Sequence, residues 1–484
     1  MKLHIDKKTK IVCTIGPASD TPEMIEKLYD EGMNVMRINF SHGTHEEQLR
    51  KIEIVRSFER NGIFIPVCLD TKGPEIRTGY MENGCVEVKK GQTLRISMKP
   101  LLGNSSKFSS SYPGLYGDVE IGDPILVDDG NLILRVKEKD AENKELVVMA
   151  ENDHPIKDQK GMNVPNANLS MPFISEQDEK DLKFGAEHDV DAIFASFVRR
   201  PEDVLELKEV LKKYGKPNIP VFSKIENPEG VKKIEDIIKV SDGVMVARGD
   251  LGDEIPPETV PLVQRRIIKL CRKYGKPVIT ATQMLDSMTT HPRPTRAEVS
   301  DVATAIDESS DCVMLSGESA SGKYPSESVR MQKNIAKAME SELPYENLSK
   351  EAFDSSERTI NDAIANSIAN TALLIGAKLI VNFSQTGNSS KRMSKARPSC
   401  PIISITNSRK ACLESAWYWG VYSHLIHTSM PDFIEEMEAL ALKVARDLGI
   451  EEGSPIIIAG GTPTGAGKTN FMRIVNVPGI HDVD

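Results

Sequence analysis

Eight short apolar runs rich in β-branched residues alternate with amphipathic stretches along the first two thirds of the chain. This alternation is typical of βα units whose strands form a parallel sheet. Helix start signals lie between the runs, including Asn227 directly before Pro228, and Ser175 three residues before Asp178. Eight such runs favour a closed (β/α)₈ barrel over an open sheet. They predict strands at residues 10–15, 34–38, 65–69, 191–195, 219–223, 243–246, 278–281 and 312–315.

Two segments depart from this pattern. Between the third and fourth runs, short alternating strands such as 85–88, 93–96 and 132–136 predict a small all-β insert. Pro74 and Pro165 lie near its two crossings and could stiffen a two-stranded hinge, so we expect the insert to swing as a lid.

After a linker predicted at residues 344–351, a second α/β pattern follows. Its predicted strands are 378–383, 402–405, 421–424, 455–458 and 473–477. The length of 484 residues fits about three domains. We therefore expect a barrel domain at 1–71 and 170–343, an inserted β lid domain at 72–169, and a C-terminal α/β domain at 344–484.

Composition narrows the possible functions. A net charge of −10 disfavours a nucleic acid partner but is compatible with small anionic substrates. No apolar run approaches membrane-spanning length, so we expect no membrane partner. The seven cysteines are scattered and include no C-x-x-C pair, which indicates reduced thiols. Since the first ten residues lack the apolar core of a signal peptide, we expect a cytoplasmic protein.

Polar and charged residues follow nearly every predicted barrel strand. In such barrels the reactive side chains come from the C-terminal ends of the strands and the loops after them, so an active site is expected at this mouth. The residues, in chain order, are Arg37, Asn39, Ser41, Asp70, Thr71, Lys72, Arg77, Ser196, Lys224, Glu226, Arg248, Gly249, Asp250, Thr282, Gln283, Ser316 and Glu318.

The residue types at this mouth point to phosphoryl transfer. Glu226 and Asp250 are hard oxygen donors that suit Mg²⁺ or Mn²⁺. Lys224 would place a fixed cation beside that metal, and the planar forks of Arg37 and Arg77 match phosphate oxygens. Taken one at a time, the same residues could be separate surface carboxylates, a solvated lysine and ordinary ion-pair partners.

Two glycine-rich loops lie in the C-terminal part of the chain. Residues 461–469 resemble a Walker A loop, but Thr462 stands where that motif needs glycine and the loop precedes a predicted strand, which disfavours an ATPase site. Residues 384–390 follow a predicted strand and open a predicted helix beside Lys391 and Arg392. That arrangement predicts a phosphate cradle, with an ordinary turn as the alternative.

Several long motifs resemble the pyruvate kinase family, and the likeness covers nearly the whole chain. The segments are 10–19 (KIVCTIGPAS), 36–43 (MRINFSHG), 69–78 (LDTKGPEIRT), 223–227 (SKIEN), 245–252 (MVARGDLG), 281–285 (ATQML) and 292–301 (PRPTRAEVSD). The resemblance implies transfer of the phosphoryl group of phosphoenolpyruvate to ADP, giving ATP and pyruvate, the last step of glycolysis. It also implies a barrel with an inserted lid and a C-terminal regulatory domain.

Particular roles follow from the resemblance. Arg37 would bind the phosphoryl group and Lys224 would stabilise its charge in flight, while Glu226 and Asp250 hold Mg²⁺ or Mn²⁺. The backbone N–H groups around Gly249 and Asp250, with Thr282, would receive the substrate carboxylate, and Thr282 would act with water in protonating the enolate.

The resemblance further assigns the nucleotide and K⁺ contacts. Asn39, Arg77 and Lys160 would meet the phosphates of ADP or ATP. The K⁺ ligands would be Asn39, Ser41, Asp70 and the Thr71 carbonyl. Glu75 is the variant associated with K⁺ dependence, so activity is expected to require K⁺.

An effector site and an assembly are implied as well. Thr386, Gly387, Asn388 and Ser389 would bind a sugar phosphate or nucleoside monophosphate, and the chain would form a homotetramer. Two alternatives stay open. A barrel enzyme that uses phosphoenolpyruvate to form a carbon bond is disfavoured by Arg77 and Lys160. A catalytically weak or dead phosphometabolite-binding paralogue would be expected to lack Lys224, Glu226 or Asp250.

Overall fold

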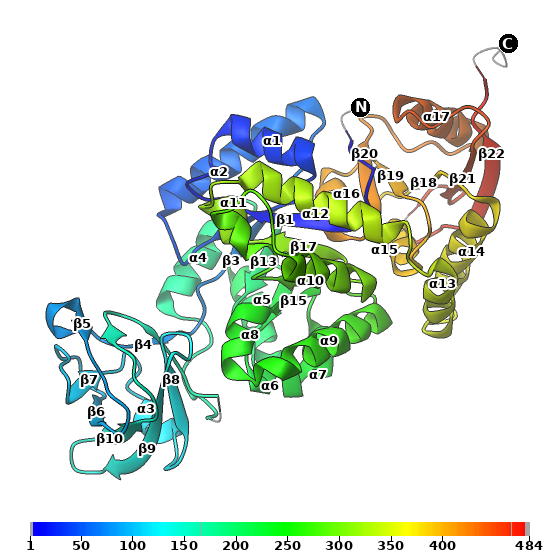
Figure 1. The fold of residues 1–484 in the computed structure, drawn as a ribbon. Coiled ribbons are helices and arrows are strands. Elements are labelled where there is room, and N and C mark those ends of the chain that lie inside the picture. The colour runs from blue at the N-terminus through cyan, green and yellow to red at the C-terminus, as the bar shows by residue number, and fades with distance from the viewer. Residues whose placement is uncertain (1–2, 166, 466, 480–484) are drawn as a thin grey trace.

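The computed structural model describes residues 3–165, 167–465 and 467–479 of the 484-residue chain. A parallel barrel lies in the middle of the molecule, with an inserted β domain at one end and a C-terminal α/β domain at the other (Figure 1). The predicted fold class is therefore confirmed. The exact domain boundaries remain a prediction.

The barrel closes in the strand order β1-β17-β16-β15-β14-β13-β3-β2, with every neighbouring pair parallel. All eight predicted strands are present. Because the pairing is parallel, their carboxyl ends meet at one mouth; for example, Asn39 lies opposite Asp70. The strands are β1 (Lys10–Thr14), β2 (Val35–Asn39), β3 (Val67–Asp70), β13 (Ala192–Ala195), β14 (Val221–Ile225), β15 (Gly243–Ala247), β16 (Val278–Ala281) and β17 (Cys312–Leu315).

Helices surround the barrel, and the sequence signals expected at their starts are present. Asn227 caps α6 by accepting from the Gly230 N–H, and Ser175 with Asp178 forms a capping box on α4. The helices are α1 (Pro22–Glu31), α2 (His45–Phe58), α4 (Glu176–Glu187), α5 (Pro201–Lys213), α6 (Pro228–Lys232), α7 (Ile234–Val240), α8 (Arg248–Glu254), α9 (Val260–Tyr274), α10 (Arg296–Asp307), α11 (Gly317–Ala320) and α12 (Pro325–Glu340). Three 3₁₀ turns accompany them, η1 (Glu59–Asn61), η3 (Pro257–Thr259) and η4 (Asp286–Thr289).

Side chains fill the barrel, so it is a packed core and not a pore. Phe194 and Phe222 pack edge to face inside it, with ring centroids 5.4 Å apart. Trp417 from the C-terminal domain packs on Phe222 at the same centroid distance of 5.4 Å. An aromatic side chain of one domain is thus part of the core of the other.

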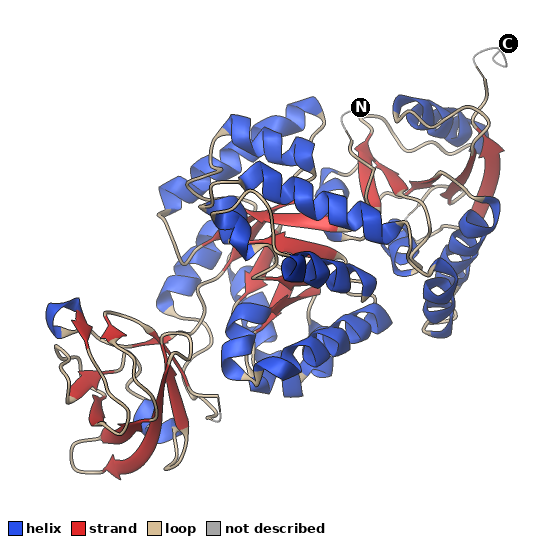
Figure 2. Ribbon diagram, viewed as in Figure 1, coloured by secondary structure: helices blue, strands red, loops and turns tan. Residues whose placement is uncertain are grey.

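The regular structure of the inserted domain is mostly β, with short strands joined by loops and only the short helical turns η2 and α3 (Figure 2). Seven strands form a sheet in the order β4-β12-β8-β9-β10-β6-β7, and β11 pairs with β5. They cover a separate apolar core that includes Phe108 and Leu134. The elements are β4 (Ile76–Arg77), η2 (Glu82–Gly84), β5 (Cys85–Val86), β6 (Thr93–Ser97), β7 (Lys107–Ser109), α3 (Leu115–Asp118), β8 (Pro124–Val127), β9 (Leu132–Asp140), β10 (Glu145–Ala150), β11 (Ile156–Lys157) and β12 (Gly161–Asn163).

The C-terminal domain is a five-stranded sheet in the order β20-β19-β18-β21-β22, flanked by helices. The last strand, β22, is antiparallel to β21 and forms one edge. The elements are α13 (Tyr345–Asp354), α14 (Ile360–Ile375), β18 (Leu379–Phe383), α15 (Asn388–Lys395), β19 (Ile402–Thr406), α16 (Arg409–Glu414), η5 (Ser415–Trp417), β20 (Val421–Leu425), α17 (Ile434–Asp447), β21 (Pro455–Gly460) and β22 (Phe471–Asn476). Among the described residues, no helix combines the length and apolar character needed to cross a membrane.

The prediction of a linker at residues 344–351 is wrong, because helix α13 begins at Tyr345. Leu348 is buried on one face of this helix and packs with Leu343 and Trp419. Tertiary burial of this apolar face stabilises a short helix that the prolines and polar residues of the segment do not suggest.

Candidate active site

A buried cluster of charges lies at the mouth of the barrel, and Lys224 is at its centre. Lys224 lies near the C-terminal end of β14. Its Nζ is 3.0 Å from Asp70 Oδ1 and 3.1 Å from Glu226 Oε1. It also donates to Ser196 Oγ at 2.8 Å. The side chains of Asp70 and Glu226 are each only 1% exposed. Three adjacent strands, β3, β13 and β14, therefore bring these residues together at one point.

Arg37 joins this cluster from β2. Its Nε donates to Asp70 Oδ2 at 2.5 Å, and one terminal nitrogen donates to Thr14 Oγ1 at 2.8 Å. Sequence reasoning did not single out Thr14. The strand-end rule could have found it, since Thr14 is the polar last residue of β1.

The cluster fixes the charge of its members. Burial alone would raise the pKa of Asp70, but the charges of Arg37 and Lys224 outweigh it and lower that pKa. Burial opposes the charged form of Lys224, yet Asp70 and Glu226 raise its pKa above the ordinary value. Lys224 is thus favoured as an ammonium, and its contacts with Asp70, Ser196 and Glu226 hold it in place, as electrostatic stabilisation of a transferring group requires.

Glu226 and Asp250 fit a divalent cation. Burial raises the pKa of Glu226 to about 8, with Lys224 opposing the rise and the like charge of Asp250 adding to it. The Phe197 N–H, at 2.6 Å from Oε2, holds the carboxylate in place. Asp250 is half-buried and faces the cleft. A buried and a half-buried carboxylate of like charge are the donor set that Mg²⁺ or Mn²⁺ would neutralise.

Gly249 and Thr282 lie together beside this carboxylate pair. The Gly249 N–H donates to Thr282 Oγ1 at 2.7 Å, and Thr282 Oγ1 donates to the Ala281 carbonyl at 2.7 Å. Thr282 has a φ of +68°, a conformation that is uncommon for a residue with a branched side chain. Arg248 supports this turn by donating to the carbonyl of Thr282 at 2.7 Å.

The residues expected to bind K⁺ lie at the ends of β2 and β3. Asn39 pairs in register with Asp70, and its Oδ1 accepts from the Ser41 N–H at 3.0 Å. The Thr71 carbonyl accepts from Ser196 Oγ at 2.5 Å. Asp70 thus belongs to the charge cluster, Asn39 and Thr71 adjoin it, and Ser41 is connected to it through Asn39.

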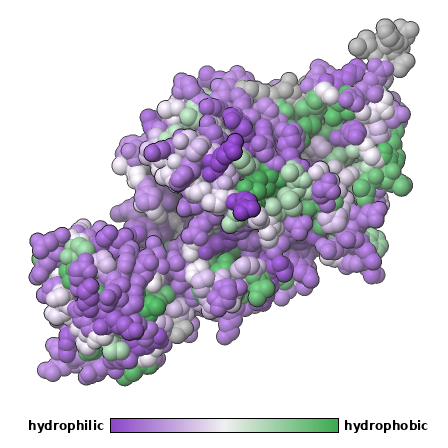
Figure 3. All heavy atoms as spheres, viewed as in Figure 1, coloured by the Kyte–Doolittle hydropathy of each residue, from purple (hydrophilic) through white to green (hydrophobic). Residues whose placement is uncertain are grey.

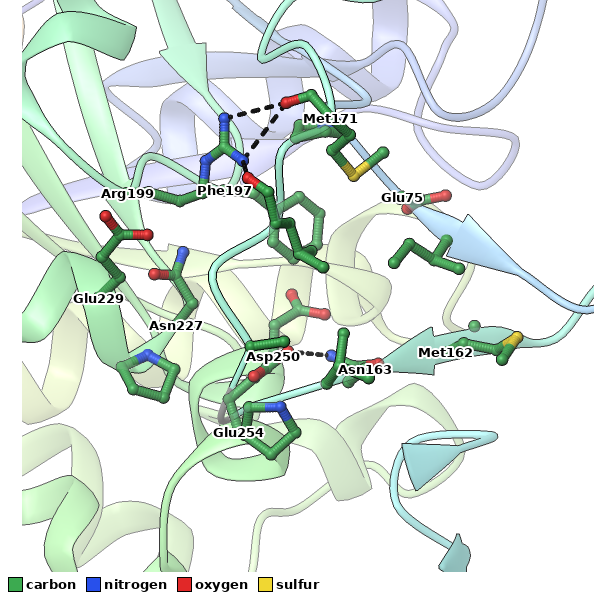
Figure 4. Close-up of a pocket in the computed structure, with 18 of the residues that line it drawn as sticks. Glu75, Met162, Asn163, Met171, Phe197, Arg199, Asn227, Glu229, Asp250 and Glu254 are labelled. Carbon is green, nitrogen blue, oxygen red and sulfur yellow. Dashed lines mark hydrogen bonds between the residues drawn. The ribbon is translucent and has the colours of Figure 1, made fainter. Parts of the chain in front are cut away.

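A cleft of about 810 Å³ separates the barrel mouth from the inserted domain. Asp250 and Phe197 line it from the barrel side, while Arg77 and Lys160 line it from the inserted domain. Arg77 and the residue after Lys160 are paired across β4 and β12. Figure 4 shows Asn163 of β12 reaching Glu254 of α8 across this cleft, at 2.6 Å. Asn39, Arg37, Lys224 and Thr282 are not among the residues that line this cleft.

The Ser196–Phe197 pair was undervalued by sequence reasoning. Ser196 appeared only as one polar strand end, and Phe197 did not appear because its contribution is a backbone N–H. Phe197 has a φ of +57°. No side-chain pattern signals a backbone donor of this kind.

The four predicted effector residues lie elsewhere, in the C-terminal domain. Gly387 has a φ of +77° and directly precedes α15, which begins at Asn388. Ser389 Oγ accepts from Asn382 Nδ2 at 2.8 Å, so the loop is tied to β18. The other glycine-rich loop, 461–469, precedes β22 as expected; its residue 466 lies outside the described residues.

Comparisons with known proteins give one consistent family. Residues 6–329 match the family model described as pyruvate kinase, barrel domain, and residues 362–475 match pyruvate kinase, alpha/beta domain. Proteins named pyruvate kinase from Staphylococcus aureus strains MRSA252 and USA300 are 47% identical over 97% of this chain and 80% of their own length. A crystal structure of a pyruvate kinase from Cryptosporidium parvum superposes with a TM-score of 0.91 and 38% identity, covering 98% of this chain and 97% of that one.

Proposed function

The chain belongs to the pyruvate kinase family, and we infer that the residues at its barrel mouth carry out that family's reaction. It transfers the phosphoryl group of phosphoenolpyruvate to ADP, giving ATP and pyruvate. In this reaction the bond between phosphorus and the enol oxygen breaks. A bond from phosphorus to an oxygen of the ADP β-phosphate forms, and the methylene carbon of the enolate takes up a proton.

One observation carries the assignment of residues. The buried cluster of Arg37, Asp70, Lys224 and Glu226 holds two fixed cations beside a carboxylate that suits a divalent ion. A phosphoryl group in flight spreads negative charge over its oxygens, and catalysis then depends mainly on positioning and electrostatic stabilisation. Lys224 stabilises that charge, and the guanidinium of Arg37 binds a phosphoryl oxygen.

Glu226 and Asp250 would hold the Mg²⁺ or Mn²⁺ ion. When bound, the ion supplies a Lewis acid that neutralises charge on substrate oxygens. Lys224 Nζ lies 3.1 Å from Glu226 Oε1, so a phosphoryl group beside this carboxylate would meet the ammonium directly. The backbone N–H groups around Gly249 and Asp250, with Thr282, orient the substrate through its carboxylate. Thr282 lies at the same turn and hands a proton to the enolate through water.

The nucleotide and K⁺ sites belong to the same proposal. Arg77 and Lys160 line the cleft from the inserted domain, where they would meet the phosphates of ADP. Asn39, at the end of β2 and outside the cleft lining, would be the nucleotide contact of the barrel. K⁺ would bind Asn39, Ser41, Asp70 and the Thr71 carbonyl. A cation there would offset the charge of Asp70 and orient Arg37, which donates to that carboxylate.

Regulation and assembly are proposed from the C-terminal domain. Thr386, Gly387, Asn388 and Ser389 follow β18, the strand at which the sheet order reverses between β19 and β21. Ligands of open α/β sheets bind at such points, so a sugar phosphate or nucleoside monophosphate effector fits this loop. We also propose that the chain forms a homotetramer and that its three domains divide at residues 72, 170 and 344. We propose the cytoplasm as its compartment, because the seven cysteines are free thiols.

The test is an assay of pyruvate formation from phosphoenolpyruvate in Mg²⁺ and K⁺, with and without ADP. We expect ADP-dependent pyruvate with equal ATP, and a steep loss of rate when K⁺ is omitted. Folded protein that makes no pyruvate even with sugar phosphates and nucleoside monophosphates present would support the alternative of a dead phosphometabolite-binding paralogue. Unchanged turnover without K⁺ or Na⁺ would remove K⁺ from the proposal alone.

A further inference from the structure

A short loop at residues 196–199 connects β13 to α5 and contacts three parts of the molecule. It lies between the charge cluster of the barrel mouth and both crossings into the inserted domain. The first crossing is the segment around Gly73, and the second is residues 169–171. Arg199 lies near the end of this loop and is buried.

On the barrel side the loop contacts the residues that hold the reacting groups. Ser196 Oγ accepts from Lys224 Nζ at 2.8 Å and lies 3.1 Å from Asp70 Oδ1. The next residue, Phe197, donates its N–H to Glu226 Oε2 at 2.6 Å. The positive φ of Phe197 directs this N–H and is maintained by the surrounding contacts. A shift of this loop would therefore move the ammonium and the carboxylate together.

The first crossing packs tightly on the same loop. A Cβ at position 73 would lie 2.8 Å from Ser196 Cβ and 2.9 Å from a ring carbon of Phe197. Gly73 also has a φ of +75°, which a residue with a side chain rarely adopts. Its N–H donates to Asp178 of α4 at 3.1 Å. The first crossing therefore packs so closely on Ser196 and Phe197 that a side chain at position 73 would displace them.

The second crossing is held by the guanidinium of Arg199. One terminal nitrogen donates to the Leu169 carbonyl at 3.0 Å, and the two terminal nitrogens reach the Met171 carbonyl at 3.4 and 3.5 Å. Figure 4 shows Arg199 at the rim of the cleft, turned toward Met171. Arg199 is itself fixed, because Asp203 accepts from its backbone N–H at 2.9 Å and from its Nε at 3.4 Å.

We propose that Arg199 is a positioning residue that couples the inserted domain to the charge cluster. Held by Asp203, it fixes the second crossing, and through Ser196 and Phe197 its loop fixes Lys224 and Glu226. Arg77 and Lys160 belong to the inserted domain, so the position of that domain relative to the barrel determines where the nucleotide phosphates bind. The inference rests on the proposed function for these roles of Lys224, Glu226, Arg77 and Lys160.

The chemistry of arginine suits this task. Its planar guanidinium has five N–H donors and can bond to a carboxylate and to two carbonyls at the same time. The compact ammonium of lysine has three donors on one nitrogen and can reach fewer of these partners. Residues at the joints of moving domains often change kcat and KM together when they are replaced. A displacement near 1 Å at reacting groups can cost on the order of 100-fold in rate.

The experiment compares Arg199→Met and Arg199→Lys with the wild-type chain. We expect Arg199→Met to raise KM for ADP about tenfold and to lower kcat about tenfold, with KM for phosphoenolpyruvate nearly unchanged. Arg199→Lys should recover part of both effects. Arg330→Met is the matched control, because Arg330 pairs with Glu31 on the outer helices away from the cleft, and it should leave the kinetics unchanged.

Hydrogen exchange of the ligand-free protein supplies the second readout. The amides of residues 167–171 should exchange faster in Arg199→Met than in the wild type and the control. A raised KM for ADP without faster exchange would mean that Arg199 contacts the nucleotide directly, and would overturn the proposal. So would unchanged KM and kcat in both variants. If Arg199→Met does not fold, Arg199→Lys decides on the same criteria. If the wild type makes no pyruvate, the proposed function fails, while exchange still tests the coupling.

Discussion

Lys224 balances the charge of the barrel mouth, since it is the cation shared by Asp70 and Glu226. Replacing it with methionine removes the stabilisation of the phosphoryl group and leaves two buried carboxylates less compensated. We expect Lys224→Met to lower kcat by roughly 10²- to 10³-fold, the scale of losing a preorganised electrostatic donor. Steady-state rates with saturating substrates would measure it.

Two controls separate this effect from misfolding. Metal binding should be largely retained in Lys224→Met, because both carboxylates proposed to hold the ion, Glu226 and Asp250, are still present. Lys208→Met at the opposite end of the barrel, where Lys208 pairs with Asp242, should keep full activity. Wild-type turnover in Lys224→Met would exclude Lys224 from the mechanism.

Lys7 is a buried lysine whose charge opposes folding. It is 2% exposed, and burial lowers its pKa from 10.5 to about 8, with Glu340 and Asp6 opposing the shift. Between pH 8 and 10.5 the folded chain therefore binds fewer protons at Lys7 than the unfolded chain does, so stability rises with pH. Below pH 8 both states are protonated and this gain is absent.

Comparison with Lys7→Met isolates this contribution. From pH 8 to 10 the free energy of unfolding of the wild type should rise relative to that of Lys7→Met, toward a full shift on the order of 3 kcal/mol. Urea unfolding at a series of pH values would measure the difference. A difference that stays flat over this window would show that Lys7 keeps its ordinary pKa in the folded chain.

At the scale of elements, Gly73 is constrained by two separate features, its positive φ and the close packing of the first crossing against Ser196 and Phe197. Gly73 and Gly62 have nearly the same φ, +75° and +76°, so an alanine at either position has a similar backbone cost of about 1 kcal/mol. A Cβ at position 62 meets no described heavy atom within 4 Å, whereas at position 73 it meets Ser196 and Phe197.

This pair of glycines gives a matched experiment. Gly73→Ala should unfold at a lower temperature than Gly62→Ala, and it should also lose activity because it displaces Ser196 and Phe197. Gly62→Ala should lose stability alone. Thermal unfolding and steady-state rates of both variants would measure this. Equal behaviour of the two would mean that the first crossing moves aside without cost.

Sequence reasoning predicted the elements whose pattern is local. The eight barrel strands were found because each is a short apolar run, and the caps at Ser175 and Asn227 because capping depends on neighbouring residues. Helix α13 was missed because its stability comes from Leu348 packing on Trp419, 71 positions further along the chain. The order of strands in the inserted domain, with β12 between β4 and β8, also depends on distant pairing.

The candidate site divides in the same way. Lys224, Glu226 and Asp70 were predicted from their places at strand ends, and the structure brings them into contact. The loop at 196–199 was not understood, because Phe197 acts through its backbone and Arg199 through carbonyls of a segment about 30 residues away. Contacts made by backbone N–H and carbonyl groups cannot be predicted from the pattern of side chains along the sequence.

At the scale of the whole molecule, the domains are joined at both ends of the barrel. Trp417 of the C-terminal domain packs on Phe222 inside the barrel, and the charge cluster lies beyond the other end of the same strands. The N-terminal segment adds a second connection, because the Gly420 N–H donates to the Lys8 carbonyl at 2.8 Å. A movement of the C-terminal domain would therefore displace β14, the strand that carries Phe222 and Lys224 and directly precedes Glu226.

The outer face of the C-terminal domain has the character of a subunit contact. Strand β22 is the edge of its sheet within the described part of the chain, and Met472 and Ile474 are exposed on it. Leu374 of the adjacent helix α14 is 87% exposed. Apolar residues gather at the right-hand edge of the view in Figure 3, over β22 and α14. An apolar edge strand of this kind is protected in solution when a second copy covers it.

Ile474→Lys tests this contact. A lysine on an edge strand disfavours pairing with another chain, so we expect the wild type to sediment as a tetramer at micromolar concentration and Ile474→Lys as a smaller species. Leu205→Lys is the matched control, since Leu205 is also about half exposed but lies on α5 of the barrel, and it should remain tetrameric. Sedimentation velocity would measure the masses. If Ile474→Lys keeps the mass of the wild type, or the wild type is a monomer, β22 is not a subunit contact and its apolar face has another cause.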